Sequence, residues 1–202
     1  MNYFLSGWAV PEIKGYNNYN FLDSTKIVAE YKTIENIARN FDKIFPKNIK
    51  TLAAWSMGAI IVLGVLQKIK AEKIILLSPA LKFAANDEDL SRLNMLRKNI
   101  IQNKETAVKL FFRKCAIPKE ASDANYYTTE ELLYGLDFLE KTEINPAQIP
   151  KNSEIIVISG ENDKIISQDL SINVAEKLGA KFVSIPNGSH FFMGNRMFLS
   201  LF

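Results

Sequence analysis

Short runs of apolar residues alternate along this chain with segments in which apolar residues recur every three or four positions. The short runs predict six strands, at residues 3–5, 19–22, 51–55, 73–78, 154–159 and 181–185. The second pattern, as in Ile34, Ile37 and Phe41, predicts amphipathic helices between several of the strands. Strands that alternate with helices form parallel sheets, so we expect an α/β fold with a mostly parallel sheet of about six strands.

The alternation stops between residues 82 and 149, where apolar stripes predict one helix after another. One stripe includes Leu90 and Ile100, and Thr128 with Glu131 has the pattern of a capping box before a later helix. Helices inserted between two strands of such a sheet lie over the carboxyl ends of the strands, where ligands bind. We therefore expect a single α/β domain over residues 1–202, with residues 82–149 forming a helical lid inserted in it.

Ser56 lies where a predicted strand meets a predicted helix over residues 57–70. Such a sharp turn exposes the serine Oγ above the sheet and directs the amino terminus of the helix at it. The turn needs small residues two positions before and after the serine, and Ala54 and Gly58 meet this need. A serine there can also simply cap the helix, so the motif by itself leaves a nucleophile and a cap both open.

His190 is the one histidine of the chain, and it follows the last predicted strand. Asp163 follows the preceding strand, so the chain order is serine, acid, histidine, as in the α/β-hydrolase triad. Glu161 competes for the role of the acid, but the Gly-x-x-Asp-x-Ile spacing resembles the pattern of that superfamily and favours Asp163. A turn aspartate and a packed histidine are the non-catalytic alternatives.

Acyl transfer also needs hydrogen-bond donors directed at the oxyanion that develops during the reaction. One expected donor is the backbone N–H of Met57, the residue after the nucleophile. The second is the N–H of Trp8, in the loop after the first strand. Many α/β-hydrolases have His-Gly where this chain has Ser6-Gly7, but a backbone donor tolerates that exchange.

Composition indicates a folded protein of a reducing compartment. Hydrophobic residues make up 48% of the 202 residues, which is enough for a sizeable core. Cys115 is the only cysteine, so no intramolecular disulfide can form, which suits the cytoplasm. The longest apolar stretch, residues 52–66, is shorter than the roughly 18 residues that span a bilayer, so we expect no membrane segment. The first residues lack the basic region of a secretory signal.

Charge is distributed unevenly along the chain. The net charge of +3 is too small to indicate nucleic-acid binding. Residues 82–119, however, carry nine basic and four acidic side chains, a net charge of +5, and residues 120–202 carry a net charge of −6. The lid segment is therefore a basic island, which suits an acidic partner or is simply a solvated helix face.

These residues together resemble a known family. The run of residues 52–58, the early Ser6-Gly7-Trp8, the Gly188-Ser189-His190-Phe191 end and residues 110–115 of the lid are similar to α/β-hydrolases that act in biotin synthesis. The resemblance is to pimeloyl–acyl-carrier-protein methyl ester esterases, closest to the compact BioG type and more distant to the BioH type. The chain departs from a complete α/β-hydrolase because the initial hairpin before the first strand is missing.

The resemblance implies a serine carboxylesterase that releases methanol from the methyl ester of a pimeloyl group carried on acyl-carrier protein. It implies no cofactor and no metal. The lid would then dock the acidic carrier protein through basic side chains. We assign this docking to Arg92, Arg97, Lys98, Arg113 and Lys114. Aromatic residues would line an acyl channel, although such residues are more often core. The candidates are Trp8, Trp55, Phe83, Phe111 and Phe112.

Three other interpretations remain open at this point. The same site would serve an acyl thioesterase or a general short-chain carboxylesterase, because both reactions pass through an oxyanion. A hydrolase-like module without activity could instead bind an acidic protein. Cys115 as nucleophile is the poorest alternative, because it lies in the lid rather than at a strand-to-helix turn. With one histidine and one cysteine, a His/Cys zinc site is implausible, whereas a metal site made of carboxylates stays open. The sequence is compatible with a monomer.

Overall fold

A single parallel sheet organises the molecule in the computed structural model, which describes residues 1–13, 18–119, 123–145 and 153–194. Its strand order is β2-β1-β3-β4-β5-β6, and every neighbouring pair is parallel. The strands are β1 (Asn2–Leu5), β2 (Asn20–Leu22), β3 (Ile49–Trp55), β4 (Ala71–Leu77), β5 (Glu154–Gly160) and β6 (Lys181–Ile185). The sheet confirms the predicted fold class, and all six predicted strands are present.

The central strands are buried on both faces near their carboxyl ends. Residues 52–55 of β3 are consecutive and almost inaccessible, although successive side chains of a strand point to opposite faces. The register places Ala54 opposite Leu76 of β4, whose last four residues are equally buried. This continuous apolar pattern is typical of parallel strands covered on both sides. It makes the carboxyl edge of the sheet a rigid base for the loops that follow the strands.

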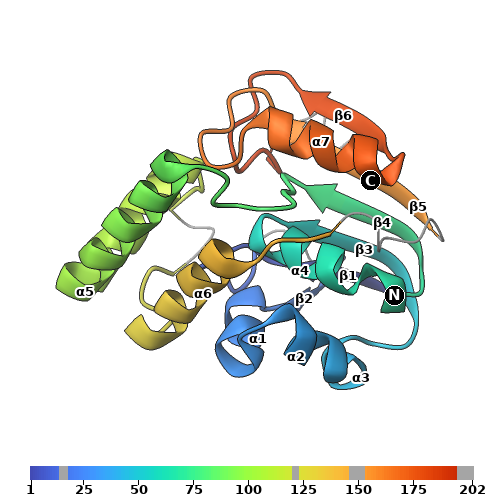
Figure 1. Cartoon of the computed structure of the whole chain (residues 1–202), viewed down its shortest axis with the longest axis horizontal. Coiled ribbons are helices and arrows are strands. Elements are labelled where there is room, and N and C mark those ends of the chain that lie inside the picture. Colours follow the sequence, from blue (N-terminus) through green and yellow to red (C-terminus); the bar gives the residue numbers. More distant parts are fainter. Residues whose placement is uncertain (14–17, 120–122, 146–152, 195–202) are drawn as a thin grey trace.

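The helices between the strands cover one face of the sheet. The connections from β2 to β3, from β3 to β4 and from β5 to β6 all step in the same direction across it. Right-handed crossovers therefore place their helices on the same side, as the view in Figure 1 shows. These helices are α1 (Ser24–Tyr31), α2 (Ile34–Arg39), α3 (Phe41–Ile44), α4 (Met57–Val65) and α7 (Gln168–Leu178). The helix predicted over residues 57–70 is shorter, since a 3₁₀ turn, Leu66–Lys68, ends it.

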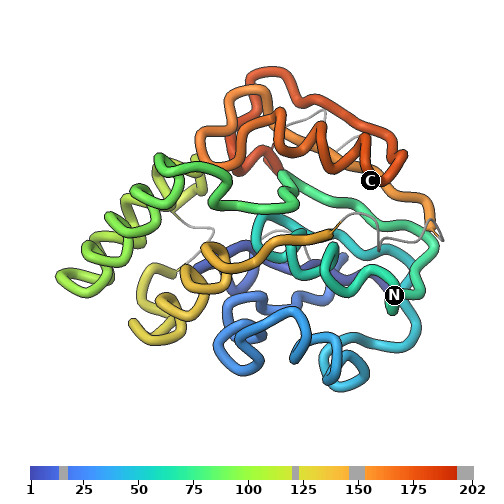
Figure 2. The backbone as a smooth tube through the Cα atoms, viewed as in Figure 1, coloured from blue at the N-terminus to red at the C-terminus, as the bar shows by residue number. Residues whose placement is uncertain are grey.

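Two further helices, α5 (Asp87–Cys115) and α6 (Thr129–Lys141), are inserted between β4 and β5. Figures 1 and 2 show both at one end of the molecule, beyond the carboxyl ends of the strands. Asn103 has a non-helical backbone (φ −156°, ψ 90°) that breaks α5 into two parts, and its Oδ1 accepts a hydrogen bond from the N–H of Thr106. The predicted capping box of Thr128 and Glu131 is confirmed. Residues 120–122 and 146–149 of the expected lid lie outside the described residues.

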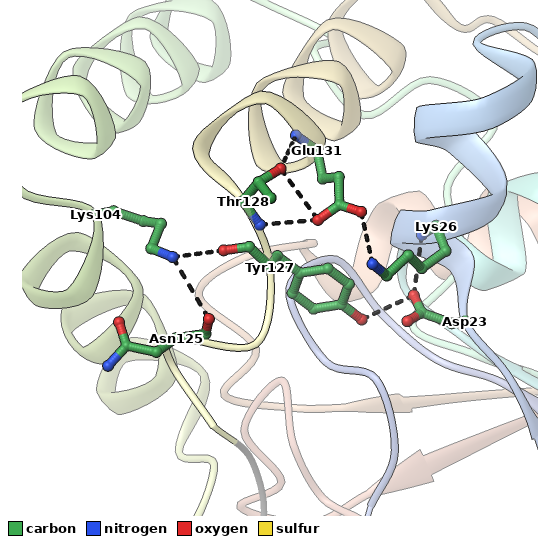
Figure 3. Close-up of polar contacts among 7 residues, drawn as sticks. All are labelled: Asp23, Lys26, Lys104, Asn125, Tyr127, Thr128 and Glu131. Atoms are coloured by element: carbon green, nitrogen blue, oxygen red, sulfur yellow. Dashed lines mark hydrogen bonds and ion pairs between the residues drawn. The ribbon is translucent and has the colours of Figure 1, made fainter.

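Polar contacts fasten this insertion to the rest of the fold (Figure 3). Lys26 of α1 pairs with Glu131 at 2.7 Å, and the hydroxyl of Tyr127 donates to Asp23 at 2.8 Å. Lys104 of α5 donates to the carbonyl of Tyr127 at 2.6 Å. Arg97 of α5 joins the two inserted helices through ion pairs with α6. The beginning of α6 is thus held between α1 and α5.

Candidate active site

Ser56 occupies the sharp turn between β3 and α4 that its sequence context predicts. Its backbone has φ 55° and ψ −117°, a conformation that residues other than glycine rarely adopt, and its N–H donates to the carbonyl of Leu77. A Cβ on Gly58 would lie 2.6 Å from the Ser6 carbonyl oxygen, so the requirement for a small residue there is met by glycine alone. The strained turn presents Oγ at the carboxyl edge, at the amino terminus of α4.

The structure brings Ser56, His190 and Asp163 into one hydrogen-bonded chain. The Nε2 atom of His190 lies 3.0 Å from the Oγ of Ser56, and its Nδ1 atom lies 2.7 Å from the Oδ2 of Asp163. The imidazole is 1% exposed and the Ser56 residue 6% exposed. Asp163 fixes Nδ1 as the protonated nitrogen, so Nε2 is free to accept a proton from the hydroxyl.

Asp163 is buried but well supplied with donors. Its Oδ1 accepts hydrogen bonds from the backbone N–H groups of Ile165 and Ile166 at 2.8 and 3.0 Å. Burial raises the pKa of this carboxyl, but the adjacent His190 and the two backbone donors outweigh that effect and leave the pKa below its ordinary value. The acid is therefore ionised at neutral pH.

Two hydrogen bonds hold the backbone at His190 and at the residue that follows it. The indole N–H of Trp55 donates to the carbonyl of His190 at 3.0 Å, and the two rings lie 5.2 Å apart. The N–H of Phe191 donates to the carbonyl of Cys115, the last residue of α5, at 2.8 Å. The imidazole of His190 is thus positioned by the strand that leads to Ser56 and by the inserted helix.

The structure does not place Glu161, the alternative acid, or Cys115, the alternative nucleophile, in the hydrogen-bonded chain of Ser56, His190 and Asp163. Glu161 does not contact the imidazole in the described structure, because its carboxylate accepts from the N–H of Asn187 and the hydroxyl of Ser184. It supports the turn that precedes His190. Cys115 is fully buried, and burial together with the charge of Asp163 raises the pKa of its thiol well above the ordinary value. A neutral, inaccessible thiol is a poor nucleophile.

The expected oxyanion donors, Trp8 and Met57, come from segments that touch. The close approach of Ser6 to Gly58 places the loop after β1 directly over the first turn of α4. The indole of Trp8 donates to the carbonyl of Leu132 in α6 at 3.0 Å, so this loop is also fixed to the insertion. The donor role of the two backbone N–H groups stays a prediction.

The five predicted acyl-chain residues separate into two groups. Phe83 and Phe111 line a cavity of about 360 Å³ along α5, which also includes Ile165, next to the Asp163 loop. Trp8, Trp55 and Phe112 are buried in the core instead. Trp8 packs edge-on against Phe111, with ring centroids 4.8 Å apart, and thereby contacts a residue of the cavity wall. Apolar cavities of this size accommodate small acyl groups.

The predicted docking residues also differ in their surroundings. Arg97 is tied to Asp137 and Glu140 of α6, and Arg92 is paired with Glu88 and Asp89 on its own helix. A further exposed set forms no ion pair with any described residue. This set consists of Lys98, Arg113 and Lys114. Arg97 therefore supports the insertion rather than standing free for a partner, and docking itself stays a prediction.

Two features are absent from the part of the chain that the structure describes. No group of three or more histidine, cysteine or acidic side chains in this part of the chain could hold a metal ion. No helix in the same residues is both long enough and apolar enough to cross a membrane.

Ser78 is a site residue that the sequence reasoning missed. Its hydroxyl donates to the Oδ2 of Asp163 at 2.8 Å. The one signal in the sequence is its position at the end of the predicted strand 73–78, which is close to the position of Ser56 after the strand 51–55. The partner lies 85 positions away, and no pattern along the chain connects two residues at that separation.

Comparison with solved structures defines the class of fold. The chain is similar to an esterase from Exiguobacterium antarcticum (TM-score 0.73, 14% identity, covering 100% of this chain and 90% of that one). It is also similar to a hydrolase from Oleispira antarctica (0.68, 12%, 86% and 72%) and to a lipase-esterase related protein from Clostridium acetobutylicum (0.63, 15%, 99% and 91%). The chain therefore has the α/β-hydrolase fold. No family model and no curated protein matches its sequence.

Proposed function

We propose that this protein is a carboxylic ester hydrolase with Ser56 as nucleophile, His190 as general base and Asp163 as the orienting acid. The observation that carries the proposal is the continuous chain of hydrogen bonds from Ser56 Oγ through the imidazole to Asp163. The strained backbone of Ser56 supports it, because a helix cap does not need a positive φ. Structural neighbours described as esterases are consistent with it.

In the proposed reaction, Ser56 Oγ attacks the ester carbonyl while His190 Nε2 takes the hydroxyl proton. The N–H groups of Trp8 and Met57 stabilise the resulting oxyanion. The imidazolium then gives its proton to the departing alcohol, which leaves an acyl-serine. Water, activated by the same imidazole, releases the carboxylic acid and restores the serine. Asp163 stays ionised throughout and stabilises the imidazolium.

For the substrate, we propose the methyl ester of a pimeloyl chain carried on acyl-carrier protein, hydrolysed in the cytoplasm during biotin synthesis. The resemblance of residues 52–58 and of the lid to such esterases supports this substrate. The apolar cavity along α5 is suited to the acyl chain. Its charged lining consists of the cations Arg92, Lys114 and Lys164 and the carboxylate of Asp89, a net positive charge that suits an anionic carrier. A thioesterase or a general short-chain carboxylesterase would use the same residues.

Labelling with a serine-directed fluorophosphonate tests the nucleophile. We expect the wild-type protein and a Cys115→Ala control to be labelled and Ser56→Ala to remain unlabelled, with hydrolysis of a p-nitrophenyl ester reduced roughly 10⁴-fold or more in Ser56→Ala. Unlabelled wild-type protein, or equal labelling of Ser56→Ala, would favour a binding module without activity.

Turnover of three substrates tests the substrate class. We expect kcat/KM to be higher for methyl pimeloyl carrier protein than for a p-nitrophenyl ester or an acyl-CoA. A preference for acyl-CoA would identify a thioesterase instead. Restoration of growth in a biotin-requiring bacterium that lacks its own esterase, by wild type but not by Ser56→Ala, would place the activity in the pathway.

A further inference from the structure

The carboxylate of Asp163 receives a donor from outside the expected three residues. Its Oδ2 accepts from both His190 Nδ1, at 2.7 Å, and the Ser78 hydroxyl, at 2.8 Å. Its Oδ1 accepts from the backbone N–H groups of Ile165 and Ile166. Of these four donors, two bind Oδ2, so without the Ser78 hydroxyl the imidazole would be the one remaining donor to that oxygen.

Ser78 reaches this position through an unusual backbone. It directly follows β4, is fully buried, and has φ 45°, in the left-handed region that disfavours residues with a side chain. Its N–H donates to the carbonyl of Ile158 in β5, which fixes the turn against the neighbouring strand. A glycine would relieve the backbone strain at this position. Strain retained in a buried residue points to a use for its side chain.

We propose that Ser78 is a positioning residue for ester hydrolysis, which holds Asp163 Oδ2 in the orientation that aligns the His190 imidazole with Ser56. The proposal rests on the proposed function of that site. Because Ser78 directly follows β4 and its N–H is bound to Ile158 of β5, it ties the acid to the end of a strand, whereas the backbone donors to Oδ1 belong to the same loop as Asp163. A carboxylate fastened on both oxygens cannot rotate about its terminal bond.

Two variants separate the hydroxyl from the backbone strain. Ser78→Ala keeps the Cβ at positive φ and removes the oxygen alone, while Ser78→Gly removes the oxygen and also relieves the strain. We expect both to lower kcat for a p-nitrophenyl ester about tenfold or more, with little change in KM. A change of this magnitude corresponds to the loss of one charge-assisted hydrogen bond. Ser159→Ala is the matched control, because Ser159 is equally buried in β5 and its hydroxyl has no partner in the described structure.

The single histidine gives a second readout that needs no substrate. In proton NMR spectra, the Nδ1–H signal of the imidazole belongs to His190 without ambiguity. We expect this signal to shift in Ser78→Ala and Ser78→Gly and to be unchanged in Ser159→Ala. Because the spectrum does not depend on turnover, it tests the positioning even if the wild-type protein proves not to hydrolyse esters.

Three results would overturn the proposal. An unchanged Nδ1–H signal in both Ser78 variants would show that the hydroxyl does not position the imidazole. Wild-type kcat in both variants would show that the position does not matter for turnover. Loss of activity in Ser78→Ala with full recovery in Ser78→Gly would assign the effect to backbone strain.

Discussion

Ser56 is held in a backbone conformation that costs free energy, of the order of 1–3 kcal/mol for a residue in a sparsely populated region. The surroundings maintain it, since its N–H is bound to Leu77 and the loop after β1 presses on Gly58. The same conformation separates Oγ from the backbone N–H groups of α4, so the side chain does not cap its helix in the described structure. The hydroxyl therefore remains available to the imidazole.

Trp55 illustrates how an aromatic residue near a candidate site can hold another site residue, here His190. It is 1% exposed, and its indole N–H binds the carbonyl of His190. We expect Trp55→Phe to lower the free energy of unfolding by about 1–3 kcal/mol, because a buried carbonyl loses its donor. Urea denaturation measures this change. We also expect kcat to fall to the same extent for esters of every acyl length, because the imidazole is less firmly held.

Steady-state kinetics with a series of acyl lengths distinguishes this role from the channel role that the sequence suggested for Trp55. A channel residue would change KM progressively with chain length. The same series on Phe111→Ala provides the comparison, since Phe111 borders the cavity. A KM effect of Trp55→Phe that grows with chain length would contradict the positioning role.

At the scale of elements, α6 and the loop after β1 are closely packed through Trp8. A Cβ on Gly135 would lie 2.4 Å from the Cδ1 atom of Trp8. Alanine is favoured over glycine in a helix by about 1 kcal/mol, but forced overpacking costs about 1–3 kcal/mol. We therefore expect Gly135→Ala to destabilise the protein by about 1 kcal/mol or more, measured by urea denaturation, and to lower kcat by displacing Trp8.

Gly194→Ala is a suitable control for the chemical change, because no atom of the residues that the structure describes lies within 4 Å of its added Cβ. It should leave both stability and kcat unchanged. A Gly135→Ala protein that is more stable than wild type and fully active would show that the loop and α6 adjust independently.

The sequence predicts elements well here and connections between them poorly. Apolar runs locate every strand to within a few residues, and the order of Ser56, Asp163 and His190 follows from those strands. Contacts such as Trp55 with the His190 carbonyl join residues 135 positions apart. Hydrophobic period carries no information about such pairs, because it reports which face of an element is buried and not what it meets. The break at Asn103 agrees with the prediction of one helix after another in this segment, although its position was not predicted, and asparagine is a residue favoured at the start of a helix.

At the scale of the whole molecule, the uneven distribution of charge predicts that an acidic carrier protein would bind at the exposed cations of α5. Reversing the exposed cations of α5 should slow the reaction with the carrier-bound ester at low ionic strength and spare a p-nitrophenyl ester. The variants are Lys98→Glu, Arg113→Glu and Lys114→Glu, combined. Added salt should narrow the difference from wild type, because it screens exposed charges. Measurement of kcat/KM for both substrates over a range of salt concentrations checks this outcome.

Cations at the opposite end of the strands supply the control. Three exposed lysines precede β3 or lie at its start, so they are at the end of the strand opposite to its carboxyl end: Lys43, Lys47 and Lys50. Their reversal changes the net charge by the same amount without touching α5. Equal slowing by both triple variants would mean that overall charge, and not a docking face, governs encounter.

The chain contains just two tryptophans, and each indole reports on a different part of the site. Trp55 lies 5.2 Å from the imidazole ring, and Trp8 joins the loop after β1 to α6. A protonated imidazole quenches indole fluorescence at such a separation. A Trp8→Phe protein would consequently emit from Trp55 alone, so that the proton on the base could be followed by light emission in real time, without an added dye.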